Sequence, residues 1–341
     1  MRISLNREFC KCSGTLADYG KAYVFMKYYL APMEGLTTYN FRTNWNRYYG
    51  GMDKYFTPFI SNRHMNSRER NDVLPEHNEE MYTVPQILTN KAEEFLSLAE
   101  QLAGYGYHEV NLNLGCPSGT VVARNRGAGF LGTPPELEAF LDEIFEKCPL
   151  EISIKTRIGM EYMDEWTPLL KIYQKFPMKE LIIHPRLQKE GYKGTPHLEA
   201  FAEAVEVLQC PLCYNGDITS PETLAQVLEK LPMIDTVMIG RGILQNPGLL
   251  LELKCASAGA SLPSPEERLA VLKEFHNSLL AGYQVIMSGD TNTLYKMKDL
   301  WTFLSHSFES PDKYVKKIRK ATDVSDYKIA VNSLFRECAL K

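Results

Sequence analysis

Short apolar runs of strand-forming residues recur eight times between residues 28 and 239, with segments of helical periodicity between them. Regular alternation of strands and helices predicts a parallel sheet. Eight such units favour a closed TIM (β/α)8 barrel over an open doubly wound sheet. The expected strands are Tyr28–Ala31, Lys54–Pro58, Thr83–Leu88, His108–Asn113, Glu151–Lys155, Leu181–His184, Leu212–Asn215 and Thr236–Ile239.

A region of different character follows the barrel. Residues 256–265, with the sequence ASAGASLPSP, are small, polar and proline-bearing, as is typical of a linker. Beyond them, apolar positions recur at helical spacing as far as Leu340. We therefore expect the barrel at 26–254, a linker at 255–265 and a bundle of about four helices at 266–341. Residues 1–25 are expected to be an unstructured extension.

Two residues predict where helices begin. Ser220 precedes Pro221, and Asn90 stands three residues before Glu93. Serine and asparagine side chains accept hydrogen bonds from the free amides of a first helical turn. Helices are therefore expected directly after Ser220 and Asn90.

Polar side chains stand at the expected carboxyl ends of five successive strands. In a TIM barrel these ends face a common site. Their amide, amine and imidazole groups would suit a flat heterocycle that has several hydrogen-bond donors and acceptors. The five residues are Gln86, Asn113, Lys155, His184 and Asn215.

The seventh and eighth strands each end in a turn that contains glycine. The first turn is Asn215-Gly216-Asp217-Ile218 and the second is Gly240-Arg241-Gly242-Ile243. Glycine lets backbone N–H groups approach a phosphate closely, and these two loops are the usual phosphate site of the fold. Arg241 adds a positive charge. The pair of turns therefore predicts a phosphate-binding site.

The eight cysteines are too sparse for a disulfide framework in a chain of 341 residues. We read them as reduced thiols, and we expect a cytoplasmic protein. Cys210 and Cys213 form a single C-x-x-C pair without a second pair or a nearby histidine, so no metal site is expected. No run approaches the ~18 apolar residues that span a bilayer, so no membrane association is expected either.

Six motifs in the expected order resemble the tRNA-dihydrouridine synthase family. They cover about Tyr28 to Leu253, and the helical tail with its basic region also resembles that family. The motifs are LAPMEGLT at the first strand, NLNLGCPS at the fourth, IKTRIG at the fifth, IIHPR at the sixth, YNGDI at the seventh and MIGRGILQNP at the eighth.

The resemblance implies FMN at the barrel mouth and NADPH as its reductant. Lys155 fits a further chemical requirement, because a cation beside the flavin stabilises its anionic reduced form. By position, the family implies backbone contacts from Pro32 and Met33, and hydrogen bonds from Gln86 and Lys155 to the pyrimidine edge. His184 would lie near the ring and phosphate side, and Asn215, Gly216, Asp217, Gly240 and Arg241 would hold the ribityl phosphate.

Cys116 lies between Gly115 and Pro117 in a short loop after the fourth strand. A lone cysteine is usually a small buried hydrophobe, but this one stands at the expected barrel mouth. The resemblance makes it the proton donor in the reduction of the uracil 5,6 double bond. A neutral thiol, with a free pKa of ~8.5, suits that role. Asn113 and Arg186 are expected to contact the substrate.

The segment after Cys116 departs from the family in its basic residues. Many members have a lysine soon after the Cys-Pro pair, whereas this chain has Arg124 and Arg126, which we expect to meet RNA phosphate. Leu187 stands where the family often has threonine, so a substrate-side hydroxyl is lost. The run Gly127–Gly132 fits G-x-G-x-x-G, but it does not follow a strand, which disfavours a Rossmann site.

The C-terminal tail is basic on an acidic body. Residues 296–341 contain ten basic and six acidic residues, whereas the rest of the chain contains 28 and 36. Lysines recur at three- and four-residue spacing, which favours one helix face, at Lys313, Lys316, Lys317 and Lys320. Such a face can hold an RNA backbone by charge, although a merely solvated helix face explains the same pattern. tRNA is the expected partner, and a monomer is the expected state.

Two other functions stay open from the sequence. One is an FMN barrel oxidoreductase that acts on a free pyrimidine-like molecule, which would need no basic tail. The other is a non-catalytic RNA-binding barrel, which would need neither Cys116 nor Lys155.

Overall fold

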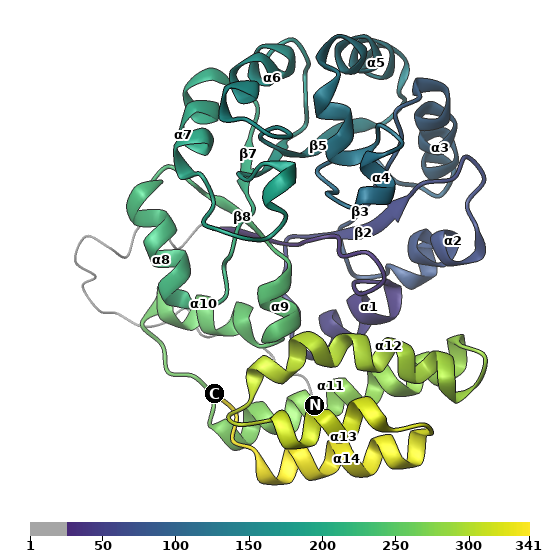
Figure 1. Ribbon diagram of the computed structural model, residues 1–341, viewed down its shortest axis with the longest axis vertical. Coiled ribbons are helices and arrows are strands. Elements are labelled where there is room, and N and C mark those ends of the chain that lie inside the picture. Colours follow the sequence, from purple (N-terminus) through teal and green to yellow (C-terminus); the bar gives the residue numbers. More distant parts are fainter. Residues whose placement is uncertain (1–25) are drawn as a thin grey trace.

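The computed structural model describes residues 26–341 and has the expected barrel, followed by a helical bundle (Figure 1). The eight strands are parallel and pair in chain order, and β8 closes the barrel against β1. Every expected strand is present, with ends within two residues of the prediction. The strands are β1 (Lys27–Leu30), β2 (Lys54–Ile60), β3 (Thr83–Ile87), β4 (Glu109–Leu114), β5 (Glu151–Arg157), β6 (Leu181–His184), β7 (Leu212–Tyr214) and β8 (Thr236–Ile239).

Helices surround the barrel and alternate with its strands, as Figure 1 shows. The α-helices are α1 (Tyr39–Tyr48), α2 (Ser67–Val73), α3 (Ala92–Gly104), α4 (Gly119–Val122), α5 (Pro134–Lys147), α6 (Trp166–Tyr173), α7 (Leu198–Val207), α8 (Pro221–Lys230), α9 (Arg241–Gln245) and α10 (Leu249–Ala258). Short 3-10 turns are η1 (Pro75–His77), η2 (Gly127–Gly132), η3 (Met163–Glu165) and η4 (Gln188–Glu190).

One of the two expected helix caps is present and the other was wrong. The Ser220 side chain accepts from the amide of Thr223 and begins α8. Asn90 instead donates its side-chain amide to the carbonyl of Arg124, 3.3 Å away, and α3 begins only at Ala92. Asn90 therefore joins two loops of the barrel rather than capping a helix.

Buried charge closes the amino-terminal end of the barrel. Lys54 Nζ lies 2.9 Å from Glu109 Oε2 and 3.0 Å from Glu180 Oε1, and the Tyr29 hydroxyl donates to Glu180 at 3.1 Å. Apolar side chains from alternate strand positions pack against one another between the two ends. The open end of the barrel is therefore the carboxyl end, where the loops carry the expected site.

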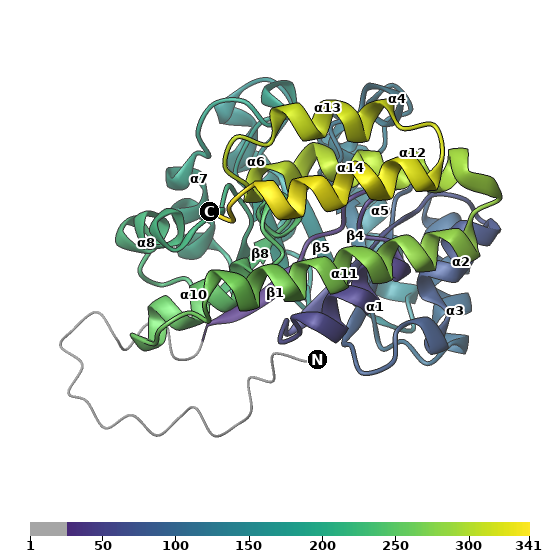
Figure 2. The ribbon, with the colours of Figure 1, turned by 90° about the horizontal axis from the view of Figure 1, so that it is seen from below.

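The C-terminal region is the expected helical bundle. No helix of residues 26–341 is long and apolar enough to cross a membrane. The helix α10 continues through Ala258, so the segment without helix or strand before the bundle is 259–264, shorter than the expected linker. The bundle contains α11 (Pro265–Ile286), α12 (Gly289–Leu304), η5 (Ser305–Ser307), α13 (Asp312–Lys320) and α14 (Val324–Glu337). In Figure 2, α13 lies at the same edge of the molecule as α4.

The bundle packs on the barrel through α11 and α1. Asn40 Nδ2 donates to the carbonyl of Leu279 at 3.2 Å, and the hydroxyls of Thr38 and Tyr283 lie 3.2 Å apart. Gly282 allows this approach, because a Cβ added there would lie 2.1 Å from Asn40 Oδ1. A second contact reaches the loop after β1, where Lys296 Nζ donates to the carbonyl of Gly35 at 3.1 Å.

Gly282→Ala should therefore destabilise the protein by about 1–3 kcal/mol, because the new methyl group displaces the buried Asn40 side chain. Gly104→Ala is the matched control. Gly104 is also helical but has no atom within 4 Å of its added Cβ, so this change should stabilise by up to ~1 kcal/mol. Urea unfolding midpoints measure both effects. Equal midpoints for the two variants would contradict close packing at Gly282.

Candidate active site

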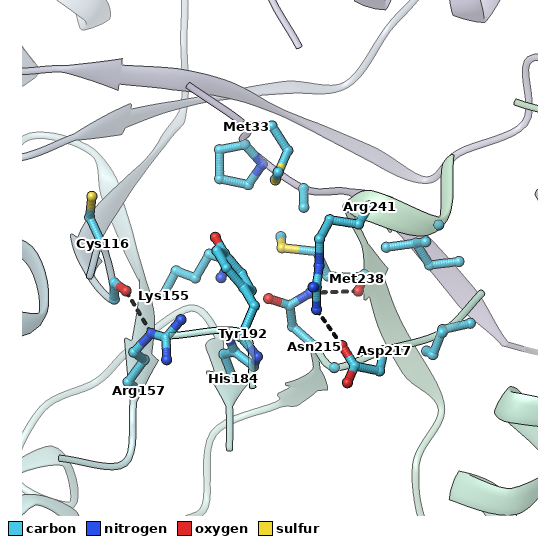
Figure 3. Close-up of a pocket in the computed structure, with 18 of the residues that line it drawn as sticks. Met33, Cys116, Lys155, Arg157, His184, Tyr192, Asn215, Asp217, Met238 and Arg241 are labelled. Carbon is cyan, nitrogen blue, oxygen red and sulfur yellow. Dashed lines mark hydrogen bonds and ion pairs between the residues drawn. The ribbon is translucent and has the colours of Figure 1, made fainter. Parts of the chain in front are cut away.

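A cavity of about 610 Å³ opens at the carboxyl ends of the strands, with lining residues from the ends or following loops of all eight. Its volume is typical of a small-molecule site, which spans roughly 300–1,000 Å³. All ten residues expected to bind the cofactor line it, together with Cys116 and Asn113. Figure 3 shows Cys116 and Lys155 on one side and Asp217 and Arg241 on the other.

Asn113 fixes the loop that carries Cys116. Its Oδ1 accepts the amides of Gly115 and Cys116 at 3.0 and 2.9 Å, and its Nδ2 donates to Gln86 Oε1 at 2.7 Å. Gln86 in turn donates to Asn111 at 2.8 Å. The carbonyl of the Asn113 amide, expected to orient a substrate, is thus engaged by its own loop, and one N–H remains for a ligand. The observed hydrogen bonds of Asn113 therefore position Cys116.

The thiol of Cys116 is protonated at neutral pH. Burial raises its pKa above the usual range, and this effect outweighs the opposing hydrogen bond from the Ser118 amide. The side chain is nevertheless partly exposed and lines the cavity. An exposed but neutral thiol can donate a proton to a molecule in the cavity.

The G-x-G-x-x-G run packs against the Cys116 loop rather than forming a dinucleotide site. It is the 3-10 turn η2, and Gly127 has a φ of 56°. A Cβ at Gly127 would lie 2.9 Å from the carbonyl oxygen of Cys116, which accepts the amide of Ala128 at 3.1 Å. The glycine therefore permits a close approach that a side chain would block.

Some polar groups in the cavity wall have no partner among the residues that the structure describes, and two of them lie near the strand ends. One is the amine of Lys155, and the other is Nδ1 of His184. The His184 ring accepts from Arg186 through Nε2 at 3.1 Å, so the neutral ring carries its proton on Nδ1. Burial, followed by the nearby Arg157, lowers the pKa of His184 well below its usual value and keeps it neutral. Unpaired polar groups of this kind are suited to a polar ligand.

The opposite side of the cavity has the features of an anion site. The Arg241 guanidinium pairs with the Asp217 carboxylate, which also pairs with Arg186. A Cβ at Gly240 would lie 3.3 Å from Met33 Sδ, and one at Gly216 would lie 2.7 Å from the hydroxyl of Tyr214. Both glycines line the cavity, and a side chain at either position would crowd these neighbours. The Asp217 carboxylate holds arginines, so only its backbone amide could face a phosphate.

Met33 differs from expectation in one respect. Its amide already donates to the Thr37 hydroxyl at 2.8 Å, and its carbonyl accepts the amides of Leu36 and Thr37 at 3.0 Å. The backbone of Met33 is thus engaged within its own turn. Its contribution to the cavity is mainly the side chain.

Arg186 does not reach the cavity, contrary to the expectation that it contacts substrate. Its side chain is fully buried and donates to the carbonyls of Lys193 and Gly194 at 3.1 and 2.5 Å. Arg157 is equally buried and donates to the carbonyls of Gly115 and Leu187 at 2.9 and 2.8 Å. Both arginines therefore hold the loops around the cavity.

The expected RNA-contacting residues lie outside the cavity. Arg126 pairs with Glu94 at 3.0 Å and donates to the carbonyl of Ser61, whereas Arg124 is exposed. Leu187 is buried and does not line the cavity. The presence of leucine where the family often has threonine therefore affects packing. Lys316, Lys317 and Lys320 are exposed on α13 and have no ion pair with any described residue.

Comparison with known proteins assigns the chain to a family. Residues 29–338 match the family model described as dihydrouridine synthase (Dus). The chain belongs to the dihydrouridine synthase family. A probable tRNA-dihydrouridine synthase of Staphylococcus aureus (strain COL) is 34% identical over 228 residues, which are 64% of this chain and 68% of the relative. A tRNA-dihydrouridine(16) synthase of Aquipseudomonas alcaligenes is 30% identical over 244 residues, 69% of this chain and 77% of the relative.

A solved structure shows the same fold at low sequence identity. Histamine dehydrogenase from Rhizobium sp. 4-9 superposes with a TM-score of 0.50 and 10% identity, over 68% of this chain and 46% of that one. This similarity supports the barrel and nothing more specific.

Tyr192 is a site residue of this dihydrouridine synthase that sequence reasoning missed. It lies in the loop after β6, is 48% exposed and lines the cavity. The signal was present in the sequence, because Gly191 and Gly194 flank a tyrosine in the segment between the sixth strand and the next helix. Phe59 and Met238 also line the cavity and were missed, since apolar residues within strands resemble ordinary core.

Lys155 should titrate well below a surface lysine. Burial and the neighbouring Arg157 lower its pKa to about 8, so the amine is charged below pH 8 and neutral above it. In protein methylated with carbon-13 formaldehyde, one lysine resonance should shift near pH 8, and the Lys155→Arg variant should lack it. Exposed lysines, with pKa values near ~10.4, serve as internal controls. Titration of every resonance together near that value would contradict the burial of this amine.

Proposed function

We propose that this protein reduces uridines in tRNA to 5,6-dihydrouridine, with FMN bound in the cavity and NADPH as the reductant. Membership of the dihydrouridine synthase family and the printed names of its relatives support the reaction and the tRNA substrate. The observation that carries the proposal is one cavity that joins the protonated thiol of Cys116 to the unpaired amine of Lys155 and the glycine turns. A monomeric state and a cytoplasmic location stay predictions.

The residues present fit a flavin phosphate. Lys155 and Gln86 would hold the pyrimidine edge, and the unpaired Nδ1–H of His184 would donate to an acceptor on the cofactor. Gly216, Gly240 and Arg241 would receive the phosphate, because the amides of Gly216 and Arg241 have no backbone acceptor among the described residues. When bound, reduced FMN supplies the hydride for C6 of the uracil, and NADPH restores its reduced form.

Cys116 supplies the proton. The S–H bond of the neutral thiol breaks as the proton passes to C5 of the uracil, and the resulting thiolate recovers a proton from water. Because burial disfavours the thiolate, the thiol is in its donating form before each turnover. Asn113 holds the loop amides of Gly115 and Cys116, so the sulfur faces a fixed position in the cavity. The uridine must leave its stack to reach that position.

The bundle would bind the tRNA body through α13. Lys316, Lys317 and Lys320 are exposed cations without an acidic partner in the described part of the chain. In Figure 2 this helix lies along the same edge of the molecule as α4, which follows the Cys116 loop. Figure 1 shows the two helices apart along the long axis, so a polyanion held by α13 would extend along this face to reach the cavity loops.

Cys116→Ala should retain bound flavin and NADPH oxidation but lose dihydrouridine formation by at least about 100-fold, the usual contribution of a general acid. Visible absorbance measures the flavin, and mass spectrometry of digested tRNA measures dihydrouridine. Cys148→Ala, at a partly buried thiol outside the cavity, is the control and should remain active.

The same assay separates the other functions. Reoxidation of the reduced enzyme by free uracil, and not by tRNA, would indicate a small-molecule oxidoreductase. Unchanged dihydrouridine in the Cys116→Ala variant would refute the role of Cys116. A purified protein without flavin absorbance would favour a non-catalytic RNA-binding barrel.

Replacement of Lys316, Lys317 and Lys320 by alanine should weaken tRNA binding and lower the slope of log K against log salt by about 2, since each lost phosphate contact removes roughly 0.7–0.9. Filter binding between 50 and 200 mM salt measures this slope. The control replaces Lys147, Lys171 and Lys230, which are exposed on barrel helices. An identical slope for both triple variants would show that α13 does not contact the RNA backbone.

A further inference from the structure

Tyr192 projects into the cavity from a loop whose backbone is held in place. Its neighbours Gly191 and Gly194 have φ values of 57° and 68°. Arg157 Nη2 donates to the Gly191 carbonyl at 2.7 Å, and Arg186 Nη2 donates to the Gly194 carbonyl at 2.5 Å. The loop is thus anchored on both sides of the tyrosine by buried guanidinium groups. Figure 3 shows the ring in the middle of the cavity, between Lys155 and Arg241.

The ring of Tyr192 contacts groups at the anion side of the cavity. The guanidinium carbon of Arg241 lies 4.4 Å from its ring centroid, and the ring of His184 stacks with a centroid distance of 6.0 Å at 30°. A cation against an aromatic face at this distance is attracted by the ring quadrupole. The guanidinium carbon of Arg157 lies farther from the same centroid, at 5.6 Å. Tyr192 therefore contacts two of the residues expected around the phosphate, and Arg241 is the nearer of the two arginines to its ring.

Arg241 has two partners that together fix its plane. The Tyr192 ring engages its face, while Asp217 engages Nη2 at one edge. Its remaining N–H groups have no partner among the described residues, and its side chain is 29% exposed. Without the ring, the guanidinium could rotate and donate a second N–H to the Asp217 carboxylate, whose Oδ2 also accepts from Arg186. That donor would then face Asp217 and not the cavity.

We propose that Tyr192 is a positioning residue, whose ring holds Arg241 with its free donors directed at the phosphate of the bound cofactor. The inference rests on the proposed function, since it assumes a flavin mononucleotide in the cavity. It predicts that Tyr192 affects flavin affinity only through the phosphate of the cofactor. A ring that merely stacked on the flavin, or filled space, would instead affect phosphorylated and unphosphorylated flavins equally.

Binding of FMN and of riboflavin to flavin-depleted protein tests this directly, because the two ligands differ only in the phosphate. Flavin fluorescence quenching measures both affinities. Tyr192→Ala should weaken FMN binding roughly tenfold, in the range of a partly desolvated cation–π contact, and should leave riboflavin within about twofold. Tyr192→Phe, which retains the ring, should bind both flavins as the unchanged protein does.

A double-mutant cycle gives the second readout. If Tyr192 acts through Arg241, then Tyr192→Ala should have no further effect on FMN affinity in an Arg241→Ala background. Tyr162→Ala is the matched control, since Tyr162 is 62% exposed and has Lys189 5.0 Å from its ring centroid but does not line the cavity. It should bind FMN normally.

The outcomes separate this inference from the function on which it rests. Equal losses for FMN and riboflavin, or additive losses in the cycle, would overturn the positioning role while leaving the flavin site intact. Unchanged FMN affinity in Tyr192→Ala would overturn it as well. Failure of the unaltered protein to bind either flavin would overturn the proposed cofactor, and this inference with it.

Discussion

The buried guanidinium of Arg157 holds the candidate active site together. It stands at the end of β5, and its three nitrogens each donate to one carbonyl, those of Gly115, Leu187 and Gly191. The first belongs to the Cys116 loop and the other two to the loop that carries Tyr192. Burial of a cation is costly, but hydrogen bonds to carbonyl oxygens offset part of that cost and leave the charge uncancelled. One side chain thus holds the Cys116 loop and the Tyr192 loop and adds positive charge to the cavity.

That uncancelled charge determines the electrostatics of the cavity. Lys155, Arg157, Arg186 and Arg241 lie at or behind its walls, and Asp217 pairs with two of the arginines. The pKa values of Lys155 and Arg157 are both lowered. Burial is the larger cause in each case, and the positive charge of a neighbouring arginine adds to it. An anionic ligand would relieve this repulsion, so the cavity is prepared for an anion before one binds.

The fold was predictable because its signals are local. Strand segments such as Leu181–His184 and Thr236–Ile239 begin and end where the sequence predicted, since β-branched runs between polar turns have few alternative conformations. The same reasoning predicted that Gln86, Lys155 and Arg241 share one cavity, because parallel strands place their carboxyl ends together. Residue identity and position within a βα unit were sufficient for both.

The partners of these side chains were not predictable in the same way. Arg186 was expected to contact substrate and instead binds the carbonyls of Lys193 and Gly194, while Arg126 pairs with Glu94. Every residue offers a carbonyl, so no sequence pattern marks the ones that a buried arginine will choose. Sequence alone therefore identifies the charged residues near a site but not which of them remain free. Only the packed loops show that Arg241 retains donors for a ligand, whereas Arg157 donates to loop carbonyls and Arg186 donates to loop carbonyls, His184 and Asp217.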